Sequence, residues 1–477
     1  MKKFLFLLTL PLVLSAQVEV DTVIDLARLL FNGHYVPELN KLYLMASDRL
    51  IVLDCSTWQK TAEFVTGSFG SAEFAWNPLR RKLYATFQTF YPEDDDGRML
   101  VIYADADTAR WISTECKSID YVASKDQLYG APFSVGGQPG RVIMVWDCET
   151  DAVVKVIPSP VGLEPSKVTW DSVADRVYTS WSSWGAPVYM SVHDVATDSL
   201  LALFRLGCAP PNKLAFHHPS RTAYFVSDEG FSVSSRAGVI DTDRMRLICL
   251  FPFEAYGHGN DGRGPVAVNT LMDKVYIGGN ENNFLCTLFI FDAAPRDSTA
   301  RTTRRIGYRG RGSERYVVWV PWSNRVYFEA RADRWSHLAV LDCETDSVII
   351  PELYLPGQRW SPYSIQLDPV RERIFAIGAD TTAIHVLRDL PSGIAEGRGP
   401  GPRSVPALAI SPNPARNLLR LSGAESVGLY APDGRRVLLL RPGENDVRHL
   451  LSGVYFVREA PGAGREAGGI TKVVIAR

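Results

Sequence analysis

The sequence lacks the short motifs that mark the commonest catalytic and metal sites. It contains seven cysteines in 477 residues, and no two of them have the C-x-x-C spacing of a zinc or redox site. It also contains no G-x-S-x-G, no H-E-x-x-H and no phosphate-binding loop. No catalytic residue, metal site or cofactor is therefore predicted, although a site assembled from distant segments would leave no local signature.

An excess of one charge and long apolar segments are also missing. The 51 basic and 53 acidic residues give a formal net charge of −2, which provides no basic field for nucleic acid. One apolar run, residues 4–14, follows Lys2 and Lys3 and precedes Ser15 and Ala16. It is shorter than the roughly 20 residues that span a bilayer, so residues 1–16 are predicted to be a signal peptide.

The cysteines do not form the pattern of a disulfide framework. Cys55, Cys148 and Cys343 each follow an aspartate in the same local phrase, which marks one repeated position in three repeats. Equivalent positions of radially arranged repeats lie much further apart than the ~7 Å between Cα atoms that a disulfide allows. These cysteines are therefore predicted to be small buried apolar residues.

A four-residue phrase recurs eight times at intervals of 41 to 52 residues. Each copy has two residues of a polar turn, then a small or aliphatic residue, then an aromatic one. The aromatic residues are Tyr43, Tyr84, Tyr129, Tyr178, Tyr224, Tyr276, Tyr327 and Phe375. An apolar run precedes the phrase in most copies, and in most a strand ending in Asp, often with Thr three residues later, follows it.

Each period predicts four short strands, and no segment with helical apolar periodicity interrupts the series. Four strands in 40 to 50 residues are typical of a β-propeller blade, whose two faces are buried by the neighbouring blades. Eight copies predict an all-β, eight-bladed propeller over residues 17–390, with seven blades as the alternative if one copy is degenerate. The last copy lacks an outer strand, and residues 18–26 are predicted to supply it and close the ring.

Two further signals come from resemblance to known families. Phrases such as Asn40-Lys41-Leu42-Tyr43, followed by Val52-x-Asp54-x-x-Thr57, resemble the YVTN-type propeller repeats of surface-layer and secreted bacterial proteins. This resemblance extends over residues 18–390. It implies the fold and says little about function, because propellers carry many unrelated activities.

The C-terminal part is predicted to be separate. Residues 391–407 are rich in glycine and proline and read as a linker, and residues 408–477 predict a small Ig-like antiparallel β-sandwich. This module resembles the C-terminal sorting domain of type IX secretion (Por) cargo through residues 411–414 (Ser-Pro-Asn-Pro), the hairpin around Gly434, residues 451–455 (Leu-Ser-Gly-Val-Tyr) and the basic, apolar end. The resemblance implies secretion across the outer membrane of a Gram-negative bacterium; an ordinary Ig-like accessory domain is the alternative.

Two loops supply the candidate ligand-binding residues. Trp181 and Trp184 form an aromatic loop whose rings would stack on sugars or on partner aromatics if exposed, or fill a core if buried. His258 and Asp261 lie in the longest insertion between repeats, where they would line the mouth of the propeller. A glycine-rich connector is the simpler interpretation of that insertion.

Three functions fit these signals. The first is a non-catalytic binding or adhesion module, secreted or held at the cell surface, with a glycan, peptide or protein ligand and with the type IX machinery as its export partner. The second is a propeller hydrolase or lactonase-like enzyme with carboxylates and a divalent ion at the central channel, and the third is a structural surface-layer component. Two or more buried carboxylates or histidines that converge at the channel would favour the enzyme.

Overall fold

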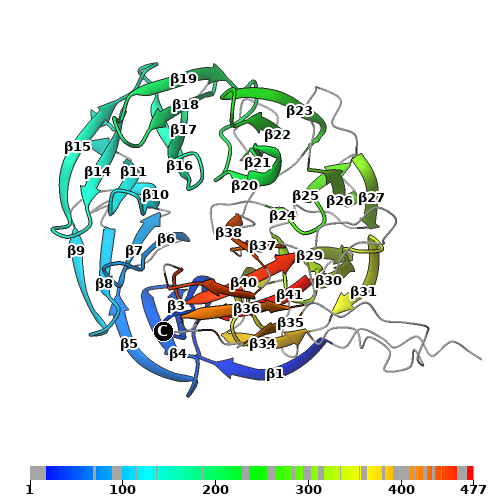
Figure 1. Cartoon of the computed structure of the whole chain (residues 1–477). Coiled ribbons are helices and arrows are strands. Elements are labelled where there is room, and N and C mark those ends of the chain that lie inside the picture. The colour runs from blue at the N-terminus through cyan, green and yellow to red at the C-terminus, as the bar shows by residue number, and fades with distance from the viewer. Residues whose placement is uncertain are drawn as a thin grey trace, which may run out of the picture.

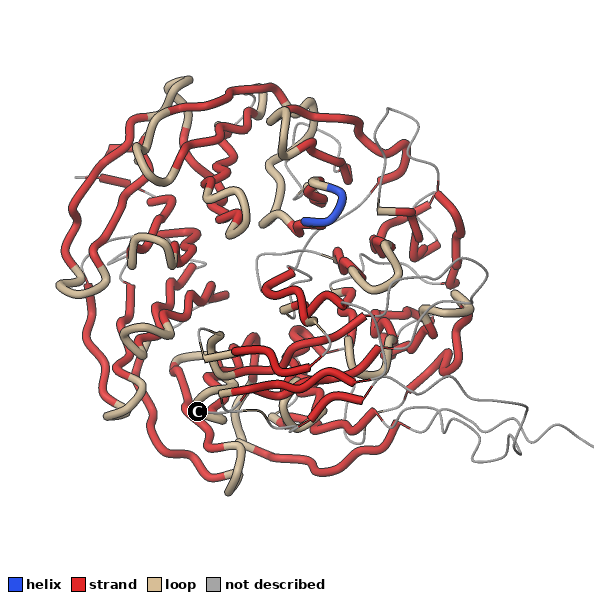
Figure 2. Tube along the Cα trace, in the orientation of Figure 1, coloured by secondary structure: helices blue, strands red, loops and turns tan. Residues whose placement is uncertain are grey.

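The computed structural model describes residues 18–67, 71–88, 99–112, 116–132, 134–135, 138–183, 186–227, 236–254, 265–281, 285–293, 302–309, 316–332, 335–353, 355, 362–378, 382–389, 409–411, 415, 417–422, 427–431, 436–441, 443–448, 450–458 and 470–475. These residues form strands almost throughout, and the helical segment among them is a single 3-10 turn, η2 (His218–Ser220) (Figure 2). The fold is all-β, as predicted.

Four-stranded antiparallel units lie side by side around a ring, and in the units whose first strand is labelled in Figure 1 that strand lies nearest the centre. Unit 1 contains β2 (Leu30–Val36), β3 (Lys41–Ala46), β4 (Arg49–Asp54) and β5 (Gln59–Val65), and unit 2 contains β6 (Ser71–Asn77), β7 (Lys82–Gln88), β8 (Met99–Tyr103) and β9 (Thr108–Ile112). Unit 3 contains β10 (Cys116–Val122), β11 (Gln127–Pro132), β14 (Val142–Asp147) and β15 (Ala152–Pro158). Unit 4 contains β16 (Glu164–Asp171), β17 (Arg176–Ser182), β18 (Tyr189–Asp194) and β19 (Leu200–Arg205). Unit 3 also carries a short ribbon of β12 (Ser134–Val135) and β13 (Gln138–Pro139).

Units 5 to 8 repeat this plan. Unit 5 contains β20 (Ala215–His217), β21 (Thr222–Val226), β22 (Arg236–Asp241) and β23 (Arg246–Glu254), and unit 6 contains β24 (Val266–Asn269), β25 (Lys274–Glu281), β26 (Leu285–Asp292) and β27 (Thr302–Arg309). Unit 7 contains β28 (Val317–Val320), β29 (Arg325–Ala332), β30 (Trp335–Asp342) and β31 (Ser347–Leu353). Unit 8 contains β32 (Pro362–Asp368), β33 (Arg373–Gly378), β34 (Ala383–Asp389) and β1 (Val18–Asp25). The residue pair Glu254 and Asn280 joins the sheets of units 5 and 6.

Turn chemistry explains why each phrase of the repeat folds as it does. The residue before the second strand has a positive φ in every unit, from Asn40 in unit 1 to Glu372 in unit 8, and is Asn or Asp in five of the eight. In the later turn, Asp54 accepts hydrogen bonds from the backbone N–H groups of Ser56 and Thr57 at 2.7 and 2.9 Å. The recurring aspartate and threonine are therefore signals for a tight turn between the third and fourth strands.

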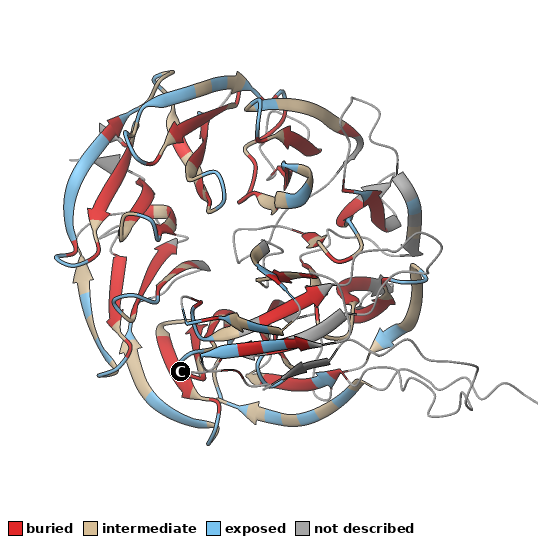
Figure 3. Ribbon diagram, in the orientation of Figure 1, coloured by how far each residue is buried: buried red, intermediate tan, exposed pale blue. Residues whose placement is uncertain are grey.

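The apolar core is divided among the junctions of the ring. Eight hydrophobic clusters each combine buried residues of two consecutive units, and the cluster between units 8 and 1 completes the circle. All eight recurring aromatic side chains are buried, and so are Cys55, Cys148 and Cys343, which are free thiols. Exposed residues are concentrated on the outer strands (Figure 3). Radial stacking of sheets, and hence a β-propeller, is confirmed.

The N-terminal strand closes the ring. β1 pairs antiparallel with β34 from Val18 opposite Asp389 to Asp25 opposite Ala383, as predicted. A shift of register between Val20 and Thr22 changes the face to which the side chains point. The side chains of Val18 and Val20 accordingly join the cluster between units 7 and 8, whereas Ile24 joins the cluster between units 8 and 1.

A polar contact also crosses every junction. The first residue of the second strand, or the recurring tyrosine two residues later, bonds to the turn or the end of the third strand in the next unit; we call these contacts the inter-unit latches. The pairs are Lys41–Asp107, Lys82–Asp151, Tyr129–Asp198, Arg176–Thr242, Thr222–Ala293, Lys274–Asp346, Arg325–Asp389 and Arg373–Cys55. The polar half of the repeated phrase therefore fastens each unit to its neighbour.

The C-terminal residues form two further antiparallel sheets. One contains β35 (Ala409–Ser411), β36 (Leu418–Ser422) and β39 (Gly443–Asp446), and the other contains β37 (Val427–Tyr430), β38 (Arg436–Leu440), β40 (Gly453–Arg458) and β41 (Ile470–Ile475). A single hydrophobic cluster, drawn only from residues after 414, lies between them. The linker predicted at residues 391–407 lies outside the described residues.

Candidate functional site

One position in or just before the inner strands carries a charged residue in several units. It lies four residues before the end of the first strand of each unit, and we call it the central position. Its occupants, in order of the units, are Asn32, Glu73, Ser118, Lys167, Lys213, Pro265, Tyr316 and Ser364. Three of the eight are charged, and the fold brings these three together.

Glu73 is the buried anion of this group. Its side chain is 6% exposed and bonds to the ammonium group of Lys167 through Oε1, while Lys213 Nζ lies 3.6 Å from Oε2. Lys213 also donates a hydrogen bond to the backbone carbonyl of Ile119 in β10. We call Glu73, Lys167 and Lys213 the central charge cluster; it joins units 2, 4 and 5 across the inner edge of unit 3.

Ion pairing determines the protonation of this cluster. Burial by itself would raise the pKa of Glu73, but the nearby charges of Lys167 and Lys213 outweigh it and hold that pKa below its usual value. Lys117, one residue before the central position of unit 3, lies 3.6 Å from Glu164. Burial lowers the pKa of Lys117; the carboxylate of Glu164 opposes this shift and the like charge of Lys167 adds to it.

The cluster partly arises from the need to satisfy a free strand edge. The inner strand of each unit has no further strand beside it, so its backbone groups need other partners. In unit 3, Glu73 accepts from the Ile119 N–H and Lys213 donates to the Ile119 carbonyl. In unit 4 the same task falls to the neutral Ser118 Oγ, which accepts from the Val168 N–H at 3.2 Å. A neutral side chain is therefore sufficient for such capping, and the charges exceed what the strand edge needs.

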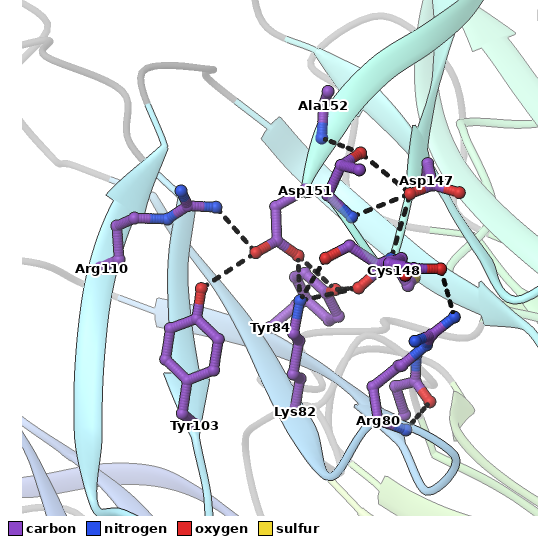
Figure 4. A network of polar contacts seen from close by, with 12 residues as sticks. Arg80, Lys82, Tyr84, Tyr103, Arg110, Asp147, Cys148, Asp151 and Ala152 are labelled. Carbon is purple, nitrogen blue, oxygen red and sulfur yellow. Dashed lines mark hydrogen bonds and ion pairs between the residues drawn. The ribbon is translucent and has the colours of Figure 1, made fainter.

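A second buried polar network surrounds Asp151 (Figure 4). Its carboxylate, 1% exposed, accepts from Lys82 Nζ at 2.9 Å, Tyr84 Oη at 2.8 Å, Tyr103 Oη at 3.1 Å and Arg110 at 2.7 Å. Burial first, and then the neighbouring Cys148 and Asp151, raise the pKa of the Tyr84 hydroxyl well above its usual value. Every partner comes from unit 2 and Asp151 from unit 3, so this network is the most elaborate of the inter-unit latches and has a structural role.

Of the four predicted ligand-binding residues, the structure describes Trp181. Trp181 is fully buried in the cluster between units 3 and 4 and donates from Nε1 to Ser191 Oγ at 2.6 Å. A buried indole with a satisfied N–H offers no face for stacking, so Trp181 is a core residue. Trp184, His258 and Asp261 lie outside the described residues, and their role stays a prediction.

Sequence reasoning missed the central charge cluster. Glu73 and Lys213 are 140 residues apart in sequence and belong to no motif. Aligning the eight repeats on their inner strands, however, would have shown charges at the central position of units 2, 4 and 5 beside neutral residues in the other five. Equivalent positions lie at one level of the ring, so this comparison would have predicted that the charged residues lie close together.

The described part of the chain contains neither a candidate metal site nor a candidate membrane-spanning helix. No group of three or more His, Cys, Asp or Glu side chains is placed to bind a metal ion among the residues that the structure describes. Within the same residues, no helix has the length and apolar character needed to cross a bilayer.

The fold and the site define a β-propeller with a buried charge cluster at the centre of its ring. No protein-family model matches the sequence, and no curated protein matches it. Among solved structures, the chain is similar to the β-propeller domain of Cps50 (Swd1) from Myceliophteria thermophila, with 11% identity, a TM-score of 0.47 and coverage of 78% of this chain and 100% of that one. It is also similar to Kuenenia stuttgartiensis hydrazine synthase, with 12% identity, a TM-score of 0.45 and coverage of 68% and 95%. Likenesses this distant add nothing to the fold that the sheets themselves define.

Proposed function

We propose that this protein is an exported β-propeller that acts as a non-catalytic binding or adhesion module, secreted or held at the surface of a Gram-negative bacterium. The ion pairing of Glu73 is the observation that supports a binding function rather than a catalytic one. A hydrolytic carboxylate needs a free oxygen for a proton, a metal ion or a nucleophilic attack, whereas both oxygens of Glu73 face lysines. The ring centre therefore suits recognition of a ligand better than hydrolysis.

Export is supported by both ends of the chain. Cleavage after residue 16 would leave β1 intact, since this strand begins at Val18, and would not disturb closure of the ring. At the other end, two observations support a sorting domain: the two-sheet module has its own core, and residues 411–414 and 451–455 carry the matching phrases. In this proposal the chain is a YVTN-type propeller that the type IX system exports by means of this domain.

Cell fractionation tests the export proposal. The full chain and a variant that ends at residue 390 would be expressed in a bacterium that has a type IX system. We expect the full chain on the surface or in the medium and the truncated chain in the periplasm. Equal distribution of the two forms would contradict the sorting role and leave the binding role untouched.

The binding proposal has its own experiment. Purified protein would be screened on glycan and peptide arrays, and in parallel against lactone and ester substrates with and without added divalent cations. We expect selective retention on an array and no turnover. The alternative function, a lactonase-like hydrolase, would show cation-dependent turnover that the Glu73→Gln variant loses.

A further inference from the structure

We propose that the central charge cluster is a binding site for a carboxylate group of the ligand, with Lys167 as its main contact. This inference rests on the proposed binding function and names the chemistry that the ring centre recognises. It depends on three observations: the charge balance of the central charge cluster, the unused donors of Lys167 within the described part of the chain, and the neutral residues at the other five central positions.

Within the central charge cluster, as the structure describes it, positive charges outnumber negative charges by one. The central charge cluster contains two ammonium groups and one carboxylate, and the adjacent pair of Lys117 and Glu164 is neutral. At the central position itself, the other five units contribute Asn32, Ser118, Pro265, Tyr316 and Ser364, none of which carries a charge. A half-buried positive charge in this setting is stabilised by an anion of unit charge.

Lys167 has the donors to hold such an anion. Its described hydrogen-bonding partner is Glu73 Oε1, so two of the three N–H donors of its ammonium group are unused within the described part of the chain. The side chains of Lys167 and Lys117 are 17% and 16% exposed, respectively, so both remain in contact with solvent. Lys167 thus has both solvent contact and donors for an anion, while Glu73 can stay paired with Lys213.

The size of the surplus favours a carboxylate over a phosphate. A carboxylate carries one negative charge, which equals the surplus, whereas phosphate carries more than one near neutral pH. Recognition of doubly charged groups usually recruits arginine, whose fork donates two parallel hydrogen bonds. The central position holds no arginine in any of the eight units. Acidic sugars and peptide C-termini are the two sources of such a carboxylate.

Calorimetric titration of the purified full chain at low salt tests the site. The probes are D-glucuronate with D-glucose as its neutral match, and N-acetyl-alanyl-alanine with its C-terminal amide; they separate a sugar source from a peptide source. Inorganic phosphate is the third probe. We expect one of the two carboxylates to bind, its neutral match to bind at least ~10-fold more weakly, and added salt to weaken binding.

Variants locate the contact. Lys167→Gln should weaken carboxylate binding at least ~10-fold, Lys167→Arg should retain it, and Lys60→Gln, the same change on the outer strand β5, should leave it unaltered. Lys117→Gln, which removes a second positive charge near the cluster, is the substitute should Lys167→Gln fail to fold by circular dichroism.

Two results would overturn the assignment. The first is that folded wild-type protein binds neither carboxylate, or binds phosphate more tightly than both. The second is that carboxylate binding is unchanged in the folded lysine variant. Array binding that persists in Lys167→Gln would leave the proposed function standing and place its ligand elsewhere.

Discussion

Single buried charges determine how firmly neighbouring units are joined. Asp151 and Asp107 occupy the same turn position in units 3 and 2, and both have a positive φ. Asp151 is 1% exposed and has four partners, whereas Asp107 is 20% exposed and, among the residues that the structure describes, pairs with Lys41. Residues at equivalent positions of the repeat are therefore expected to contribute differently to the free energy of unfolding.

This difference gives a prediction for a matched pair of variants. Asp151→Asn leaves the buried ammonium of Lys82 without its counter-charge, so we expect a loss of about 3 kcal/mol in the free energy of unfolding. Asp107→Asn should cost less than about 1 kcal/mol, because its partner remains partly hydrated. Guanidinium denaturation measures both, and equal losses would contradict the assigned weights.

His193 makes stability depend on pH. It stands where the other seven units place an apolar residue at the end of the third strand, and it is 3% exposed. Burial lowers its pKa from 6.5 to about 4, with Asp198 opposing the shift. The unfolded chain therefore binds this proton more readily than the folded one, and stability falls as the pH drops from 6.5 towards 4.

The expected loss between pH 7.5 and 5 is ~2 kcal/mol. His193→Leu restores the apolar residue of the other units, so its stability should be nearly constant over the same interval. Denaturation midpoints at both pH values measure the change. A parallel pH dependence in the leucine variant would assign the effect to other groups.

Some of these residue roles could be predicted from sequence and others could not. The burial of the cysteines after aspartate could be predicted, because they mark one repeated position of the strand pattern. The burial of Trp181 was left open, because indoles serve cores and ligand surfaces equally well. The pairing of Glu73 with Lys167 and Lys213 depends on which units meet at the ring centre, and a single repeat does not contain that information.

At the scale of elements, the short strand β1 both completes a unit and contributes to two apolar clusters. Its eight residues form the outer strand of unit 8, and Val18, Val20 and Ile24 contribute to two different apolar clusters. The sequence predicted this strand because residues 18–26 resemble the outer strands while unit 8 lacks one. The register shift after Val20 could not be predicted, since it depends on which clusters the side chains reach.

We expect a chain that lacks residues 18–26 to lose about 4 kcal/mol or more of stability, since several partly buried apolar side chains contribute about 1 kcal/mol each. A synthetic peptide of residues 18–26 should restore the stability by pairing with the exposed edge of β34. The same peptide with Ile24→Asp is the control. Thermal denaturation with and without peptide measures the effect, and rescue by the control peptide would rule out specific pairing.

At the scale of the whole molecule, the chain contains two kinds of core. The ring has eight clusters shared between neighbours, so each unit relies on its neighbours to bury its apolar faces, whereas the C-terminal sheets share one cluster of their own. The repeat period predicted the first kind. The second was predicted only through resemblance and strand signals, because a small sandwich has no internal repetition.

Separate cores predict separate unfolding. Calorimetry of the full chain should show two transitions, and a chain that ends at residue 390 should keep the transition of the ring at an unchanged temperature. A shifted transition in the truncated chain would show that the C-terminal module stabilises the ring.

The pairing of β1 with β34 has a consequence for how the protein is made. During synthesis, β1 must wait for residues 383–389, more than 350 positions later, before it finds its partner. Until then the ring stays open and β1 remains available to other strand edges. Such long-range closure is slow, so the last step of folding falls after nearly the whole propeller has been synthesised.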